Sequence, residues 1–141
     1  VACFDDKDKD IPEVSNIKVN LNIRHFEKDL FTVDTTDAIV AMTRLDSLYP
    51  NFFKDIYLSK IIPALQNPQI FSLFIRTPEI RHLYDTTMTV YGDFTILEKE
   101  LTKAFQFHQY YFPDQSVPEI VTFISEYSVF ISKSPKSLEK L

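Results

Sequence analysis

The residues with the clearest chemical potential lie at the start of the chain, where Val1 and Ala2 precede the single cysteine, Cys3. This thiol has no second cysteine with which to form a disulfide. Small or aliphatic residues directly before a cysteine are typical of the sites at which lipoprotein signal peptidases cut. The pattern predicts that Cys3 is acylated, which would tether the protein to a membrane without a spanning helix. The alternative is an exposed, unmodified thiol.

Metal or proton chemistry would require histidines at a defined spacing, but His25, His82 and His108 are scattered along the chain. They form no HExxH motif and no cluster with the cysteine. His82 and Asp85 are three residues apart on a predicted helix, a spacing that suits a shared metal or proton and equally a solvated surface pair. His108 lies on an apolar stripe, which is typical of a core histidine. No cofactor is predicted.

Nucleophilic and paired-carboxylate chemistry are not indicated either. A GxSxG nucleophile elbow needs two glycines, and the chain has a single glycine. Glu98 and Glu100 are two apart on a predicted helix and therefore point in different directions. The acidic run at residues 5–10 lacks the glycine and the terminal glutamate of an EF-hand loop. The sequence thus shows no catalytic motif.

The composition of the chain argues against several classes of function. The 141 residues are enough for one domain with a sizeable core. A single glycine argues against phosphate-cradling loops and dinucleotide fingerprints, which need several. The net charge of -5 argues against binding nucleic acid, which depends on clustered Lys and Arg. No run of about 18 apolar residues predicts a transmembrane helix.

The elements that must position any site begin after a polar segment. Residues 4–15 are acidic and alternate in charge, which predicts a tether that does not pack. Residues 17–24 alternate between apolar and polar side chains and predict a strand, followed by a loop that runs to Asp34. Thr35, Thr36 and Asp37 then offer a cap for a helix.

Helical periodicity dominates the middle of the chain. The most strongly patterned helix is expected at 96–111, with Thr95 and Glu98 as a capping box. Two β-rich runs near the end predict a hairpin. The predicted helices cover residues 38–48, 52–61 after a break at 49–51, 70–74, 79–91 and 96–111, and the hairpin arms cover 120–124 and 129–131.

This order predicts an α+β fold, in which four to five helices cover a small sheet made of one N-terminal strand and a C-terminal hairpin. Residues 1–15 are predicted to be a tether with a lipidated cysteine, and residues 16–141 a single α+β domain.

Three segments resemble the GldB family of gliding motility-associated lipoproteins. They are residues 44–53 (RLDSLYPNFF), residues 90–105 (VYGDFTILEKELTKAF), and residues 110–114 (YYFPD) leading into 117–125 (VPEIVTFIS). With a cysteine at the start of the mature chain, they cover nearly all of the sequence in the family's order. Members of the family are considerably longer, so the resemblance implies either an N-terminal portion or a shortened relative.

The resemblance implies a membrane-anchored, non-enzymatic component of a bacterial envelope machine for gliding and its associated secretion apparatus. The expected location is the periplasmic or surface-exposed side of the envelope, with envelope or motility proteins as partners and no nucleic acid. Asp5 and Asp6, just behind Cys3, resemble a lipoprotein sorting signal; the alternative is that this run is simply a hydrated spacer.

A partner would dock on an aromatic-rich face, since tyrosine tolerates both water and burial. The residues from which such a face can be drawn are Tyr49, Phe52, Phe53, Tyr57, Tyr84, Tyr91, Tyr110 and Tyr127.

Two other functions stay open. The family is distantly similar to zinc peptidases, whose metal-binding helix would lie beyond Leu141. A degenerate or incomplete metallopeptidase-like hydrolase would have only His82, Asp85 and His108 as candidate site residues, and it requires them to converge. A small-ligand carrier would need an apolar pocket between the helices and the sheet.

Overall fold

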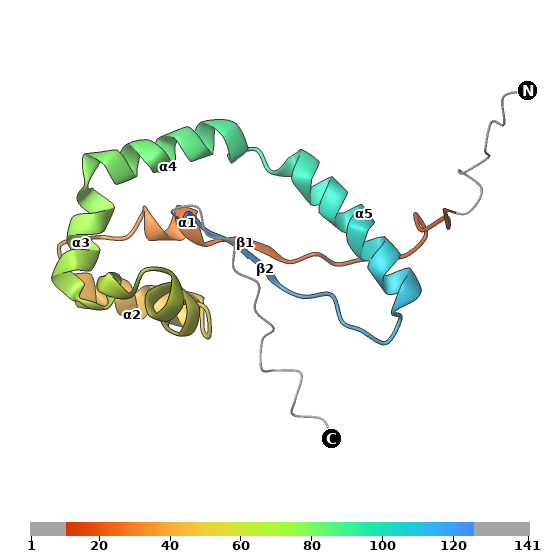
Figure 1. Ribbon diagram of the computed structural model, residues 1–141, viewed down its shortest axis with the longest axis horizontal. Coiled ribbons are helices and arrows are strands. Elements are labelled where there is room, and N and C mark those ends of the chain that lie inside the picture. Colours follow the sequence, from red (N-terminus) through yellow and green to blue (C-terminus); the bar gives the residue numbers. More distant parts are fainter. Residues whose placement is uncertain (1–10, 126–141) are drawn as a thin grey trace, which may run out of the picture. The chain divides into compact units, whose positions relative to one another are not determined.

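The computed structural model describes residues 11–125, which divide into two compact units (Figure 1). Among these residues, unit 1 comprises 11–23 and 93–120, and unit 2 comprises 24–92 and 121–125. Several helices with a small sheet confirm the predicted α+β class. The single domain predicted for residues 16–141 stays a prediction. The elements in chain order are β1 (Ile23–His25), α1 (Phe26–Leu30), α2 (Ala38–Leu48), the π-helix η2 (Phe53–Ile61), the 3₁₀-helix η3 (Pro63–Gln66), α3 (Pro68–Arg76), α4 (Pro78–Tyr91), α5 (Thr95–Tyr111) and β2 (Ile120–Thr122).

β1 and β2 form a two-stranded parallel sheet. The backbone N–H of Ile120 donates to the carbonyl of Asn22 at 2.9 Å, and the side chain of His25 lies against that of Thr122. β1 is shorter than the strand predicted at 17–24. Within the described part of the chain, only the last residues of that segment have a partner strand. Alternation of apolar and polar side chains is therefore not sufficient for a strand, which also needs a partner for its backbone hydrogen bonds.

The predicted C-terminal hairpin is described only in its first arm. That arm is β2, and it pairs with β1 from the other end of the chain. The second arm, at residues 129–131, lies outside the described residues. β2 thus begins where the sequence predicts a strand, and its pairing with β1 agrees with the predicted sheet of an N-terminal strand and a C-terminal hairpin.

The loop predicted after β1 is wrong, because α1 follows the strand directly. Phe26 and Leu30 are four residues apart, so they share one face of this short helix, and both are almost fully buried. Phe31, directly after the helix, is buried with them. Tertiary packing of these side chains therefore stabilises a helix too short to be stable alone.

The helices of unit 2 begin and end at residues that the sequence marks. Asp37 caps α2, accepting hydrogen bonds at 3.1 Å from the backbone N–H groups of Ile39 and Val40. The predicted break after α2 is confirmed, and Asn51 adopts a positive φ of 69° there. Asparagine is one of the few residues that enters this region at low cost. Asn67 caps α3 in the same way as Asp37 caps α2.

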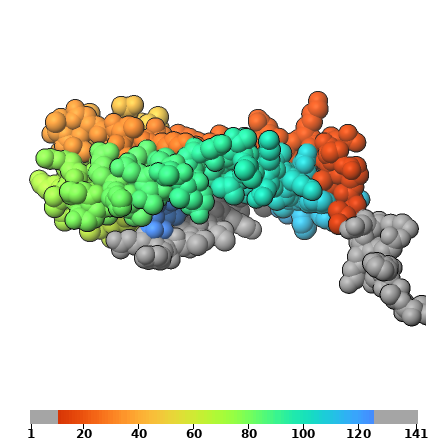
Figure 2. All heavy atoms as spheres, turned by 90° about the horizontal axis from the view of Figure 1, so that it is seen from above, coloured from red at the N-terminus to blue at the C-terminus, as the bar shows by residue number. Residues whose placement is uncertain are grey.

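The core of unit 2 is built around Phe26, which is 0 % exposed. Its ring packs edge-on against Tyr49 at 5.1 Å between centroids and lies 4.7 Å from the ring of Tyr57. Around the edge of this core, Phe31 stacks on Tyr84 of α4 at 4.5 Å, and Arg81 donates to the Phe31 carbonyl. The orange segment after α1 accordingly lies against the green helix α4 (Figure 2).

Unit 1 is organised by α5. The predicted capping box of Thr95 and Glu98 is wrong: the helix begins at Thr95 without a side-chain cap, and Asp93 accepts from the Thr95 N–H at 3.0 Å. The Asp93 carboxylate therefore stabilises the turn that leads into the helix. Hydrogen bonds from Thr95 lower the pKa of Asp93. Val14, inside the predicted polar tether, is buried, so packing begins before residue 15.

Candidate functional site

Glu27, on α1, is the only buried charged side chain among the residues that the structure describes. Its carboxylate accepts a hydrogen bond from Oγ1 of Thr122, which lies 2.8 Å from one oxygen and 3.0 Å from the other. Nδ1 of His25 lies 3.3 Å from Glu27 Oε1 and 2.9 Å from the same threonine oxygen. We call these three residues the Glu27 cluster; all of them belong to unit 2.

The proton positions in the Glu27 cluster follow from its geometry. A threonine hydroxyl has one hydrogen, and the ionised carboxylate of Glu27 can only accept, so the hydroxyl donates to Glu27. The lone pairs of that hydroxyl then face Nδ1 of His25, which must carry a hydrogen and donate. The cluster thereby assigns the Nδ1–H form to His25, neutral or protonated.

This arrangement is not a hydrolytic triad, although it contains a hydroxyl, an imidazole and a carboxylate. In a triad the nucleophile and the carboxylate contact opposite nitrogens of the histidine ring. Here Thr122 and Glu27 both face Nδ1, and the threonine proton is directed to the carboxylate. What the cluster can do is hold β2 against the junction of β1 and α1, because hydrogen bonds to a buried charge are strong.

Tyrosines surround this junction in the same unit. The hydroxyl of Tyr49 donates a short hydrogen bond to Asp29, and the guanidinium of Arg24 lies 4.1 Å from the Tyr49 ring centre. Burial, together with Asp29, raises the pKa of Tyr49. Burial and the charge of Glu27 raise the pKa of Tyr84. Both phenols therefore stay neutral and serve as hydrogen-bonding and packing groups.

The predicted site residues belong to different units or lie outside the described residues. Cys3, Asp5 and Asp6 lie outside the described residues. His82 and Asp85 are exposed on α4 in unit 2, whereas His108 belongs to α5 in unit 1. Within residues 11–125 no group of three or more His, Cys, Asp or Glu side chains is placed to hold a metal ion. The convergence of His82, Asp85 and His108 that the hydrolase alternative requires stays a prediction.

His108 packs between aromatic rings, at 6.1 Å from Phe105 and 5.3 Å from Phe112. Its Nδ1 is buried and, in the described part of the chain, has no hydrogen-bond partner. The residue thus packs among rings but is only half-buried, so it is not the core histidine that the apolar stripe indicates.

Most of the proposed aromatic docking face is in fact core. Tyr49, Phe53 and Tyr57 are buried, because their rings surround Phe26. Phe52 and Tyr84 pack against the same core. Of the remaining predicted members, Tyr91 and Tyr110 are exposed, and Tyr127 lies outside the described residues.

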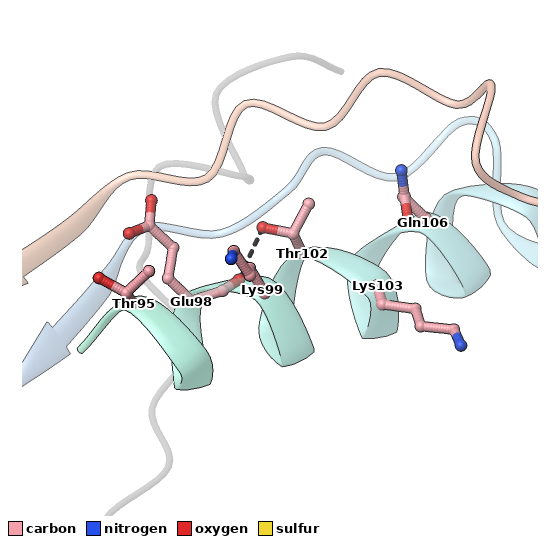
Figure 3. Close-up of a pocket in the computed structure, with 6 residues that line it drawn as sticks. All are labelled: Thr95, Glu98, Lys99, Thr102, Lys103 and Gln106. Atoms are coloured by element: carbon pink, nitrogen blue, oxygen red, sulfur yellow. Dashed lines mark hydrogen bonds between the residues drawn. The ribbon is translucent and has the colours of Figure 1, made fainter. Parts of the chain in front are cut away.

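A shallow pocket runs along one side of α5 in unit 1 (Figure 3). Its polar groups are partly engaged already: Thr102 Oγ1 donates to the carbonyl of Glu98, and Gln106 Nε2 donates to the carbonyl of Ile17 at 3.0 Å. The lining residues are Thr95, Glu98, Lys99, Thr102, Lys103 and Gln106. All lie on one helix, so this is not the predicted apolar pocket between helices and sheet, and its exposed charges are typical of a solvated face.

Comparison with known families decides the relationship that the sequence motifs suggest. A family model described as gliding motility protein GldB matches residues 7–136. The chain belongs to this family. The match spans both units and the segments quoted above, so the predicted membership of the GldB family is confirmed and links the chain to gliding motility.

No curated protein and no solved structure matched the chain. Among the described residues, no helix is both long enough and apolar enough to cross a membrane.

Sequence reasoning missed the Glu27 cluster. His25 is visible only as one of three scattered histidines, and neither Glu27 nor Thr122 stands out. Their sequence separation of 95 residues hides the contact. The sequence contains only a weak indication that Glu27 is buried: it directly follows Phe26 and lies in the short segment between the two apolar residues Phe26 and Leu30.

Proposed function

We propose that this GldB family protein is anchored to a membrane of the bacterial envelope by acylation of Cys3, and that it acts there as a non-enzymatic component of the gliding machinery and its associated secretion apparatus. The observation that carries the proposal is the family match over residues 7–136. The sequence Val1-Ala2-Cys3 supports the anchor.

The anchor would confine the protein to a periplasmic or surface-exposed membrane face. One acyl chain binds a bilayer only marginally, so stable attachment requires the several chains of a mature lipoprotein or a protein partner. Asp5 and Asp6 would either direct sorting between envelope surfaces or serve as part of a hydrated spacer.

A non-enzymatic role is supported by how the polar groups of unit 2 are used. The buried carboxylate of Glu27 is engaged by Thr122 and His25 in a structural contact, and Tyr49 is engaged by Asp29. These groups hold elements together and leave no activated nucleophile beside a base.

Chemical cross-linking in intact cells, followed by mass spectrometry, tests this role. We expect the native protein to capture gliding or secretion subunits, and Cys3→Ser to lose both this capture and membrane fractionation. An Asp5→Asn/Asp6→Asn variant separates sorting from anchoring, because it keeps the acyl chain. Unchanged membrane fractionation of Cys3→Ser would contradict the anchor, and capture of no specific envelope protein would contradict the machine component.

A further inference from the structure

The C-terminal end of α5 exposes three consecutive aromatic side chains. Tyr110, Tyr111 and Phe112 are 50 %, 59 % and 52 % exposed, and the two tyrosine rings contact each other edge-on at 5.0 Å. We call these three residues the aromatic tip. Residues 104–113 include no Asp, Glu, Lys or Arg, so no charged side chain from this stretch has to be desolvated when the tip is covered.

The N-terminal segment reaches α5 close to this tip. Gln106 Nε2 donates to the carbonyl of Ile17 at 3.0 Å, and Val14 is buried in the same unit. Gln106 is four residues before Tyr110, which is about 6 Å along a helix axis. The red N-terminal residues and the cyan end of α5 lie side by side in both views (Figures 1 and 2).

The electrostatics of the segment agree with this placement. Glu13 accepts a hydrogen bond from the backbone N–H of Ser15 at 2.8 Å. Hydrogen bonds from Ser15, and beyond them the charge of Lys103 on α5, lower the pKa of Glu13. Residues 13–17 thus lie beside the second half of that helix.

The length of this chain sets the distance between the anchor and the tip. Eleven peptide units separate Cys3 from Val14, so the segment spans at most about 40 Å when fully extended. An acyl anchor on Cys3 would therefore keep Val14, which is buried in unit 1, within about that distance of the bilayer. Such a short tether gives an effective concentration near the millimolar range, so even weak surface contacts become occupied.

We propose that Tyr110, Tyr111 and Phe112 dock into the headgroup region of the lipid bilayer to which Cys3 is attached. This inference rests on the anchor proposed above. Tyrosine rings favour the membrane–water interface, because the ring is apolar while the hydroxyl keeps contact with water and headgroups. The tip thereby supplies the second attachment that a single acyl chain lacks.

A single-tryptophan measurement tests the docking, since the chain contains no tryptophan. The acylated Tyr111→Trp chain is placed on vesicles of phosphatidylethanolamine and phosphatidylglycerol, with and without brominated acyl chains. The matched control is Ile96→Trp, because Ile96 is 71 % exposed near the other end of α5. The two positions are about 22 Å apart along the helix axis.

We expect the emission of Tyr111→Trp to shift to shorter wavelength and to lose intensity with brominated lipid, while Ile96→Trp changes little. Adding Tyr110→Ser and Phe112→Ser to Tyr111→Trp should abolish the shift. Equal quenching at both positions would overturn docking through the tip. A blue shift without quenching by brominated lipid would overturn the lipid assignment and indicate a protein contact instead.

Acylation of Cys3 is measured independently of docking, so each of these two proposals can be refuted without the measurement for the other. Intact-mass analysis of the membrane-extracted chain reports the acyl chains, and sedimentation with vesicles reports attachment. An acylated, vesicle-bound Tyr111→Trp chain whose tryptophan is unquenched would overturn only the docking. A chain without added acyl mass would refute the anchor, and the docking inference would be overturned with it.

Discussion

Replacing Thr122 with valine isolates the hydrogen bond that holds β2 to α1. Valine keeps the branched shape of threonine and suits a strand, so packing changes little while the hydroxyl is lost. Among the described residues, the buried carboxylate of Glu27 then keeps only the contact with His25 Nδ1 at 3.3 Å. Unit 2 should become less stable, because a buried charge loses a donor.

The size of the loss follows from the geometry. Oγ1 of Thr122 lies within hydrogen-bonding distance of both carboxylate oxygens, but its one hydrogen makes a single charge-assisted bond. Such a bond contributes about 1.5–3 kcal/mol. Because His25 can still donate to the carboxylate, we expect Thr122→Val to lower the free energy of unfolding by about 2 kcal/mol.

Urea unfolding followed by circular dichroism measures this difference. Thr43→Val on α2 is the matched control: its hydroxyl also bonds, to the Ile39 carbonyl at 2.8 Å, but it is exposed. A surface change of this kind alters the free energy of unfolding by at most about 0.5 kcal/mol. In a double-mutant cycle, Glu27→Gln should reduce the effect of Thr122→Val, since neighbours in one network are coupled.

If Thr122→Val and Thr43→Val unfold at the same urea concentration, the Glu27 cluster contributes nothing to stability. Additive effects of Glu27→Gln and Thr122→Val would likewise refute the direct bond.

Three further perturbations test the core, a cap and the buried phenols. Phe26→Ala should cost about 3–5 kcal/mol in urea unfolding, because a fully buried ring is removed, whereas Ile39→Ala at a 66 % exposed position should cost little; equal losses would contradict the assigned core. Asp37→Ala should cost about 1 kcal/mol and Asp37→Asn much less, since asparagine also caps; equal values by thermal unfolding would show that the cap is dispensable. Burial holds the pKa of Tyr57 above its unfolded value of about 10. Above about pH 10 this phenol therefore loses its proton in the unfolded chain before it does so in the folded one. The free energy of unfolding then falls by up to about 1.4 kcal/mol per pH unit. Urea unfolding across alkaline pH should show a shallower fall in Tyr57→Phe, and an identical slope would contradict the buried phenol.

Much of the helical framework could be predicted from the sequence, because its signals are local. Asp37 caps α2 within three residues of its own position, and the break at Asn51 depends on that residue's tolerance of positive φ. Prediction from local sequence failed at α1, because this five-residue helix is stabilised by packing of its buried side chains in the core of unit 2. It also failed at Thr95, where a plausible capping box gave way to a turn made by Asp93.

Family membership could likewise be predicted from the sequence, because motifs spread over the chain can be recognised without knowing which residues are in contact. The Glu27 cluster and the aromatic tip could not. The cluster joins residues that are 95 positions apart, and no periodicity reports such a contact. The tip became visible only when the other predicted docking aromatics, such as Tyr49 and Tyr57, proved to be buried.

The sequence by itself determined where most helices begin, the acidic character of residues 4–15 with Cys3 ahead of them, and the family. Tertiary structure alone decided which strand pairs with β1, which aromatic rings enter the core, and that Glu27 is buried with Thr122 as its donor. Capping and periodicity act over a few neighbouring residues. Pairing and burial depend on segments distant along the chain that meet only when it folds.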